Sequence, residues 1–293
     1  MAIIQNNSDP LLSDFLKACT NNDAALALQL APEREPALLT FGLNDALRGR
    51  HFDLATQLVK AGARWDTFTV QSASRSPDGV RWLVESGYDV NTSLVGGTVL
   101  LPMVVTYNDE VSIPYLLEQG ANPNLGPLMN PRDPGPMMNR RPVPNSCVVL
   151  NQAASTCTPE IFALLLAHGA NIANATPLHN AAAAFTQLRV HSPICSRVLM
   201  LEYLVGLGLD VNALDDARTI PEDARGRTGT PLTYAIQWSR VEEARWLLEH
   251  GADPDKKSTF GWSARDQAKS MARGMPPDHE MAVLFRRFKL LEA

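Results

Sequence analysis

The sequence predicts an all-α solenoid, a stack of helix–turn–helix units in which each unit buries its apolar face only against its neighbours. One short phrase recurs six times, as KAGARWD, ESGYDVN, EQGANPN, AHGANIA, GLGLDVN and EHGADPD. Apolar residues at helical spacing precede the glycine of each phrase. These anchor glycines recur at roughly 33-residue spacing, which is typical of repeat proteins. They are Gly62, Gly87, Gly120, Gly169, Gly208 and Gly251.

The most regular unit runs from residue 230 to residue 251, TPLTYAIQWSRVEEARWLLEHG. Thr230 is expected to cap the first helix by accepting from backbone N–H groups, and Pro231 loses no hydrogen bond at the first helical position. Gly251 is expected to end the second helix in a left-handed turn. Both helices carry apolar stripes, at Leu232, Ala235 and Ile236 and at Val241, Ala244, Leu247 and Leu248.

A second copy begins at Thr176 with TPLHNAA. With this copy the units resemble ankyrin repeats, whose signature is T-P-L-H-x-A in a helix–turn–helix unit closed by a β-turn. The resemblance implies a binding module. Its ligand-facing positions would be the tips of the turns between units, called fingers, and the exposed end of each first helix. Those helix ends are Tyr107, Thr156, Ala184 and Trp238, with Phe185 adjacent.

The repeat register divides one single domain, residues 1–293, into about eight units. We expect them at residues 10–40, 41–65, 66–97, 98–124, 146–175, 176–214, 228–259 and 260–293. The copy at Gly87 is degenerate, and SASRSPDGVRWLVESG is its only clear part. Pro102 is expected to kink or shorten its helix, whereas Pro114 fits a tolerated first turn.

Departures from the repeat concentrate in the middle of the chain. Inserted fingers are expected at residues 125–145 and 215–227, and FTQLRVHSPIC lengthens the unit that begins at Thr176. The first finger combines prolines and methionines with Arg132, Arg140 and Arg141, a mixture suited to recognition. It can equally be a disordered excursion without a role. The second finger, which includes Asp216 and Arg227, is either a solvated polar loop or part of a binding groove.

The composition and charge of the chain argue against several classes of function. A formal charge of −5 without a long basic run disfavours nucleic-acid binding. The longest apolar run, residues 161–167, is too short to span a membrane. The first residues lack the pattern of a secretory signal, and the four cysteines show no disulfide-framework density. An intracellular location, in the cytoplasm or the nucleus, is therefore expected.

The sequence contains no recognisable catalytic or metal-binding motif. It therefore disfavours an enzyme and predicts neither a cofactor nor a metal site. Five of the six histidines occupy regular repeat positions and are expected to hydrogen-bond the turns: His51, His168, His179, His250 and His279. Only His191 lies outside the repeat pattern.

The leading hypothesis is an intracellular protein-interaction scaffold that captures a protein or peptide through Tyr107, Trp238 and the finger at 125–147, with Phe185 either exposed or in the core. The alternative is a small-molecule-binding or tailoring enzyme with a pocket in the central repeats. A self-associating structural protein is a third option. For the alternative, the converging polar groups are Arg132, Arg140, Arg141, His191, Asp216 and Arg227.

Overall fold

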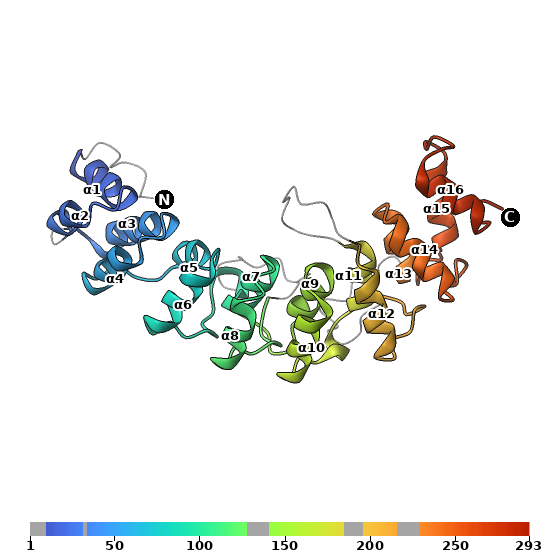
Figure 1. Cartoon of the computed structure of the whole chain (residues 1–293), viewed down its shortest axis with the longest axis horizontal. Helices are drawn as coiled ribbons and strands as arrows, with labels where there is room; N and C mark the ends of the chain where they lie inside the picture. Colours follow the sequence, from blue (N-terminus) through green and yellow to red (C-terminus); the bar gives the residue numbers. More distant parts are fainter. Residues whose placement is uncertain (1–9, 32–33, 128–140, 185–195, 216–228, 293) are drawn as a thin grey trace. The chain divides into compact units, whose positions relative to one another are not determined.

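The computed structural model describes residues 10–31, 34–127, 141–184, 196–215 and 229–292 (Figure 1). In these ranges the regular structure is helical, apart from one isolated antiparallel bridge between Gly126 and Val143. The α-helices follow one another in pairs, as an all-α repeat fold requires. The chain divides into two compact bodies, residues 1–94 and 95–293, here called the N-terminal and C-terminal bodies.

Three helix pairs form the N-terminal body. In each pair the first helix packs against the second, and the first helices also pack against one another in a row. The pairs are α1 (Pro10–Thr20) with α2 (Ala24–Leu30), α3 (Pro36–Arg48) with α4 (Phe52–Lys60), and α5 (Thr67–Ala73) with α6 (Pro77–Glu85). Helix α3 begins at Pro36, so the unit boundary expected at residue 41 falls inside this helix.

The copy that looked degenerate forms a complete helix pair. Its first helix, α5, begins with a reciprocal capping box instead of the threonine–proline start. The Thr69 backbone N–H donates to the Asp66 carboxylate at 2.8 Å, and the Asp66 backbone N–H donates to Thr69 Oγ1 at 2.6 Å. Two N-terminal donors are thereby satisfied without the usual motif.

The C-terminal body contains five further pairs arranged as two layers (Figure 1). The first-helix layer consists of α7 (Leu100–Thr106), α9 (Val148–Thr156), α11 (Pro177–Ala183), α13 (Pro231–Gln237) and α15 (Ala264–Ala272). The second-helix layer consists of α8 (Ser112–Glu118), α10 (Pro159–Ala167), α12 (Val198–Gly206), α14 (Val241–Glu249) and α16 (Glu280–Arg287). Two 3₁₀ turns, η1 (Val95–Gly97) and η3 (Ile172–Asn174), lie in the fingers.

The recurring phrase forms the turn after six of the second helices, from α4 to α14. All six anchor glycines have φ between +82° and +111°, the left-handed region predicted for them. In the C-terminal body the asparagine at the end of the phrase joins one finger to the next. Asn124 donates through Nδ2 to the Gly169 carbonyl at 2.8 Å and accepts from the Asn171 backbone N–H at 2.8 Å. Asn212 makes the same two bonds to the following finger.

Two expectations about helix starts are corrected. Thr230 is fully buried and makes no side-chain cap; its hydroxyl lies 3.4 Å from the hydroxyl of Thr233. Pro102 neither kinks nor shortens α7, because the helix begins at Leu100. Pro102 is therefore its third residue, in a turn whose N–H groups have no helical partner. Pro114 lies in the first turn of α8, as predicted.

Two features bear on the environment of the chain. Across the ranges that the structure describes, no helix combines the length and apolarity needed to cross a bilayer. Three of the four cysteines fall in those ranges, and Cys19, Cys147 and Cys157 are free thiols.

Candidate functional site

The open side of the first-helix layer in the C-terminal body is the candidate site. Helix α13 is packed by α11 and α15 of its own layer and by α14 of the second-helix layer. The side of the first-helix layer that faces away from the second helices is here called its open side. Trp238 directly follows α13 and is 47% exposed, which confirms the exposure predicted for it. Tyr107 occupies the same place after α7 and is partly exposed.

The predicted row of aromatic residues is interrupted between these two. Thr156, at the end of α9, is partly exposed, and its hydroxyl donates to the Gln152 carbonyl at 2.9 Å. Ala184, after α11, is 2% exposed and adopts a left-handed conformation at φ +45°. Phe185 lies outside the described residues. Trp238 is therefore the largest exposed side chain at these helix ends within the part of the chain that the structure describes.

The described residues on either side of 128–140, 185–195 and 216–228, here called stems, are held by hydrogen bonds. The stem of the first is the bridge at Gly126, where Val143 donates to the Gly126 carbonyl at 2.8 Å and the reverse bond measures 3.2 Å. Ser146 Oγ also donates to the Pro127 carbonyl at 2.9 Å. A Cβ atom on Gly97 would lie 2.7 Å from the Arg141 carbonyl oxygen, so η1 packs directly against this stem. Arg141 itself is exposed.

The stem of the 216–228 segment closes around a buried histidine. The Asp215 N–H donates to the Gly229 carbonyl at 3.2 Å, and the Gly229 N–H donates to the Asp215 carboxylate at 3.1 Å. His179 Nε2 lies 3.1 Å from the Ala213 carbonyl and 3.2 Å from the Gly229 carbonyl. Tyr234 donates its hydroxyl proton to Asp215 and packs its ring edge-on against His179 at 5.3 Å.

The protonation of His179 follows from these contacts. Both partners of Nε2 are carbonyl acceptors, so this nitrogen carries the proton. Nδ1 is buried and has no hydrogen-bond partner among the described residues. Burial lowers the pKa of His179, while the nearby Asp215 carboxylate opposes this shift. The ring is therefore a neutral structural donor, as predicted for the repeat histidines.

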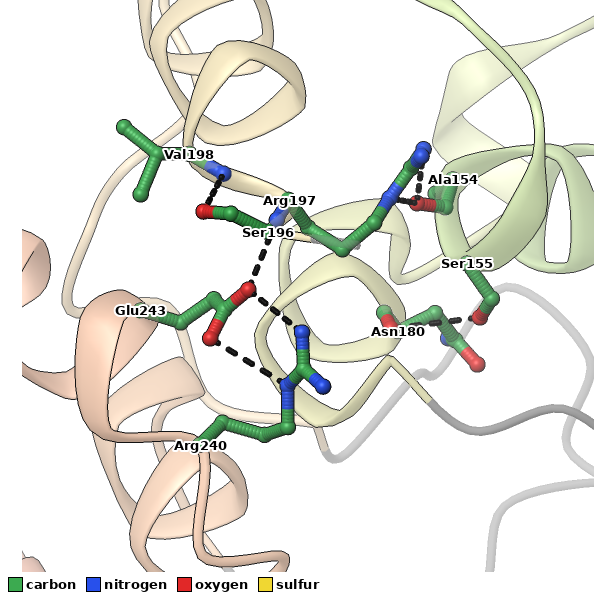
Figure 2. A network of polar contacts seen from close by, with 8 residues as sticks. All are labelled: Ala154, Ser155, Asn180, Ser196, Arg197, Val198, Arg240 and Glu243. Atoms are coloured by element: carbon green, nitrogen blue, oxygen red, sulfur yellow. Dashed lines mark hydrogen bonds and ion pairs between the residues drawn. The ribbon is translucent and has the colours of Figure 1, made fainter. Parts of the chain in front are cut away.

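The stem of the 185–195 segment is a network that joins four helices (Figure 2). Glu243, in the first turn of α14, is 1% exposed and accepts from the Arg197 backbone N–H at 2.6 Å. It also accepts from Arg240 Nη2 at 2.7 Å and from Arg240 Nε at 3.2 Å. The Arg197 guanidinium donates to the Ala154 carbonyl at 2.9 Å and to the Cys157 carbonyl. The network thus places a cation at the C-terminus of α9 and an anion at the N-terminus of α14, as the helix dipoles favour.

Along the chain, residues 128–140 and 216–228 precede a first helix, whereas residues 185–195 follow one. Of the predicted site residues, Tyr107, Arg141 and Trp238 belong to the described part of the chain. The others, Arg132, Arg140, Phe185, His191, Asp216 and Arg227, lie outside the described residues.

In the described part of the C-terminal body, the sequence analysis missed two exposed aromatic residues. Phe260 is 76% exposed and Trp262 is 43% exposed, and both lie in the finger between α14 and α15. The Trp262 indole N–H donates to Gln267 Oε1 at 3.2 Å, and its carbonyl accepts from the Ser258 N–H at 2.8 Å. The available signal was an aromatic residue on each side of Gly261, in a segment where only a turn was expected.

Three more of the histidines in repeat positions contact the backbone, as expected. His51 Nε2 lies 3.1 Å from the Thr20 carbonyl, and His250 Nδ1 lies 2.7 Å from the Trp246 carbonyl. His279 Nδ1 accepts from the Met281 N–H at 3.2 Å. In the ranges covered by the structure, no three side chains of His, Cys, Asp or Glu gather so that they could hold a metal ion.

Part of the chain matches a known protein family. The family model for ankyrin repeats, in three copies, matches residues 150–258, from α9 to the finger after α14. Residues 150–258 are therefore similar to three ankyrin repeats. The matched region includes Arg197, Glu243 and Trp238.

Solved structures give two similar chains. The ankyrin repeat domain of human ASB11 is 21% identical, with 97% of this chain and 98% of that chain covered and a TM-score of 0.46. The ankyrin repeat domain of Bcl-3, described as a unique member of the IkappaB protein family, is 17% identical, with 86% of each chain covered and a TM-score of 0.45. A search of curated protein sequences found no match.

Proposed function

We propose that this protein binds a protein or peptide partner inside the cell, across the open side of the first-helix layer of its C-terminal body. Ankyrin repeats generally mediate protein–protein interaction, and the matched repeats carry the candidate site. The single observation that carries the proposal is Trp238, a large aromatic side chain that is 47% exposed directly after a helix packed by three others.

Trp238 is not required for the core beneath it. Leu232, Ala235 and Ile236 supply the inward contacts of α13, and each is fully buried. An exposed indole on a rigid frame buries a large apolar surface when a partner covers it, at little cost in conformational entropy. Tryptophan is also among the residues most enriched at binding hot spots.

The insertions fit the same proposal. Backbone hydrogen bonds close the stems at Gly126 and at Asp215, and Arg141 is exposed in the first of them. The small-molecule alternative has no comparable support, because five of the six polar residues expected to line its pocket lie outside the described part of the chain. The proposal therefore commits to a macromolecular partner.

The test is loss of partner capture on Trp238→Ala. Protein from the source cells would be captured on wild type, on Trp238→Ala and on the double variant Tyr107→Ala/Trp238→Ala. The affinity of a captured partner would then be measured by titration calorimetry. If Trp238 is a hot spot, the single variant weakens binding by about 2 kcal/mol or more, roughly thirtyfold.

Leu199→Ala is the matched control. Leu199 is 70% exposed, but it lies on α12 in the second-helix layer of the same body. Thermal unfolding of every variant establishes that each is folded. A partner that binds Trp238→Ala as tightly as wild type, and loses affinity with Leu199→Ala, would place the interface on the second-helix layer and overturn the proposal.

A further inference from the structure

The N-terminal body carries a groove in its second-helix layer, away from its first helices. It lies between α4 and α6, which pack against each other less closely than α2 and α4 do. The groove is open and has a volume of about 310 Å³. That volume is near the lower limit for ligand pockets and suits one long side chain better than a cofactor. The lining residues are Phe52, Asp53, Thr56, Asp78, Arg81, Trp82 and Glu85.

Two aromatic rings line the groove. Phe52 and Trp82 come from the two facing helices and stack with centroids 6.4 Å apart and an interplanar angle of 29°. The Trp82 indole N–H donates to Thr56 Oγ1 at 2.8 Å. This bond fixes the orientation of the ring, which is 8% exposed, while Phe52 is partly exposed. The aromatic pair is therefore held in place before any ligand arrives.

Carboxylates surround this aromatic surface. Asp53 projects from α4, and Asp78 and Glu85 project from α6; all three are exposed. Arg81 stands between Asp78 and Glu85 at the three- and four-residue spacings that allow pairing along a helix. It offsets one negative charge of the three, so the lining keeps a formal charge of −2. Aromatic faces bordered by unbalanced carboxylates from two helices are complementary to a cation.

We propose that the α4–α6 groove binds an arginine side chain presented by a partner protein. A guanidinium is planar and weakly hydrated, so it can stack on the exposed part of the Phe52 ring, which Trp82 supports from the facing helix. The guanidinium N–H groups point outward in the plane of the group, where they can donate to carboxylates on both α4 and α6. A lysine ammonium supplies the charge but neither the stacking face nor the paired donors. This surface lies on a different body from Trp238, so it does not depend on the function proposed above.

The test uses a defined probe on the full-length chain. The protein would be labelled with 5-fluorotryptophan, and its five tryptophan signals would be assigned by single Trp→Phe variants. The capped tripeptide acetyl-Gly-Arg-Gly-amide would then be titrated to 20 mM, beside the same peptide with lysine and with the neutral arginine analogue citrulline. We expect a saturable shift of the Trp82 signal with the arginine peptide, at least threefold weaker binding of the lysine peptide, and no shift with citrulline.

Substitutions of carboxylates distinguish binding in the groove from nonspecific attraction to the negative charge of the protein. The triple variant Asp53→Asn/Asp78→Asn/Glu85→Gln replaces exposed groups and should stay folded, while its affinity for the arginine peptide falls at least tenfold. Asp14→Asn removes an exposed carboxylate from α1 and should leave the affinity within twofold. Three results would each overturn the proposal: no saturable Trp82 shift, equal binding of the citrulline or lysine peptide, or an unchanged affinity in the triple variant.

Discussion

Substitution of Glu243 by alanine should destabilise the C-terminal body by about 3–5 kcal/mol. The carboxylate is 1% exposed and accepts three hydrogen bonds, one from the Arg197 backbone and two from Arg240. The Arg240 side chain is only 12% exposed, so the variant would leave a cation without its main counter-ion. Breaking a buried pair from one side costs far more than the net value of the pair, because the remaining charge stays desolvated.

Glu243→Gln should cost less, about 1–3 kcal/mol. The amide keeps the shape of the side chain and one carbonyl acceptor but loses the charge and places an N–H₂ group against a donor. Urea unfolding followed by far-UV circular dichroism measures both variants. With a slope of about 2–3 kcal/mol per molar urea, the alanine variant should lower the midpoint by about 1–2 M.

Glu242→Ala provides the control, since Glu242 is exposed in the same turn of α14 and should change stability by less than about 0.5 kcal/mol. A double-mutant cycle with Arg240→Met isolates the pair: if the ion pair carries the effect, the two substitutions together should cost much less than their sum. The reasoning is refuted if Glu243→Ala costs no more than Glu242→Ala, because the network would then contribute nothing to the stack.

Three further predictions test other contacts. Burial lowers the pKa of His179, whereas in the unfolded chain it stays near 6.5, so the unfolded state binds the proton first and stability falls as pH drops below about 6.5. His179→Gln cannot titrate and should flatten the pH dependence of the urea midpoint between pH 7 and 5; an unchanged slope would contradict this. Gly97→Ala should cost about 1–3 kcal/mol in urea unfolding, and more than Gly169→Ala, because both have positive φ but only Gly97 meets the Arg141 carbonyl. Asn212→Ala removes two hydrogen bonds between fingers and should lower the free energy of unfolding by about 1–2 kcal/mol, whereas a loss below 0.3 kcal/mol would show that water replaces them.

The helical repeat could be predicted from the sequence because its signals are local. A glycine with positive φ follows six of the second helices, and a proline at the start of α11 and α13 fits the first helical position. The exposure of Trp238 could be predicted because the small and apolar residues of α13 fix which side of the helix faces the core. His179 followed from its place in the T-P-L-H signature.

What escaped prediction depends on contacts distant in sequence or on substitutes for the usual motif. Arg197 and Glu243 meet only after folding, and neither belongs to a repeat signature. Helix α5 uses an Asp66–Thr69 box in place of threonine–proline, so a search for the usual start passes over it. Thr230 has the residue type of a cap, yet its burial between neighbouring repeats directs the hydroxyl to Thr233. Tertiary context overrides a local preference in each case.

The Arg197–Glu243 network occurs where the repeat is most disturbed. After α13, three residues lead directly into α14, and the short turn itself sets the position of the second helix. Between α11 and α12 the chain includes residues 185–195, so no three-residue turn sets the position of α12. The start of α12 is set instead by Glu243 from the following repeat and by the carbonyls of Ala154 and Cys157 from the preceding one (Figure 2). We infer that this network allows a repeat to carry an insertion between its helices while the neighbouring repeats stay in register. Loss of the network should therefore destabilise the whole stack of repeats and not only the insertion.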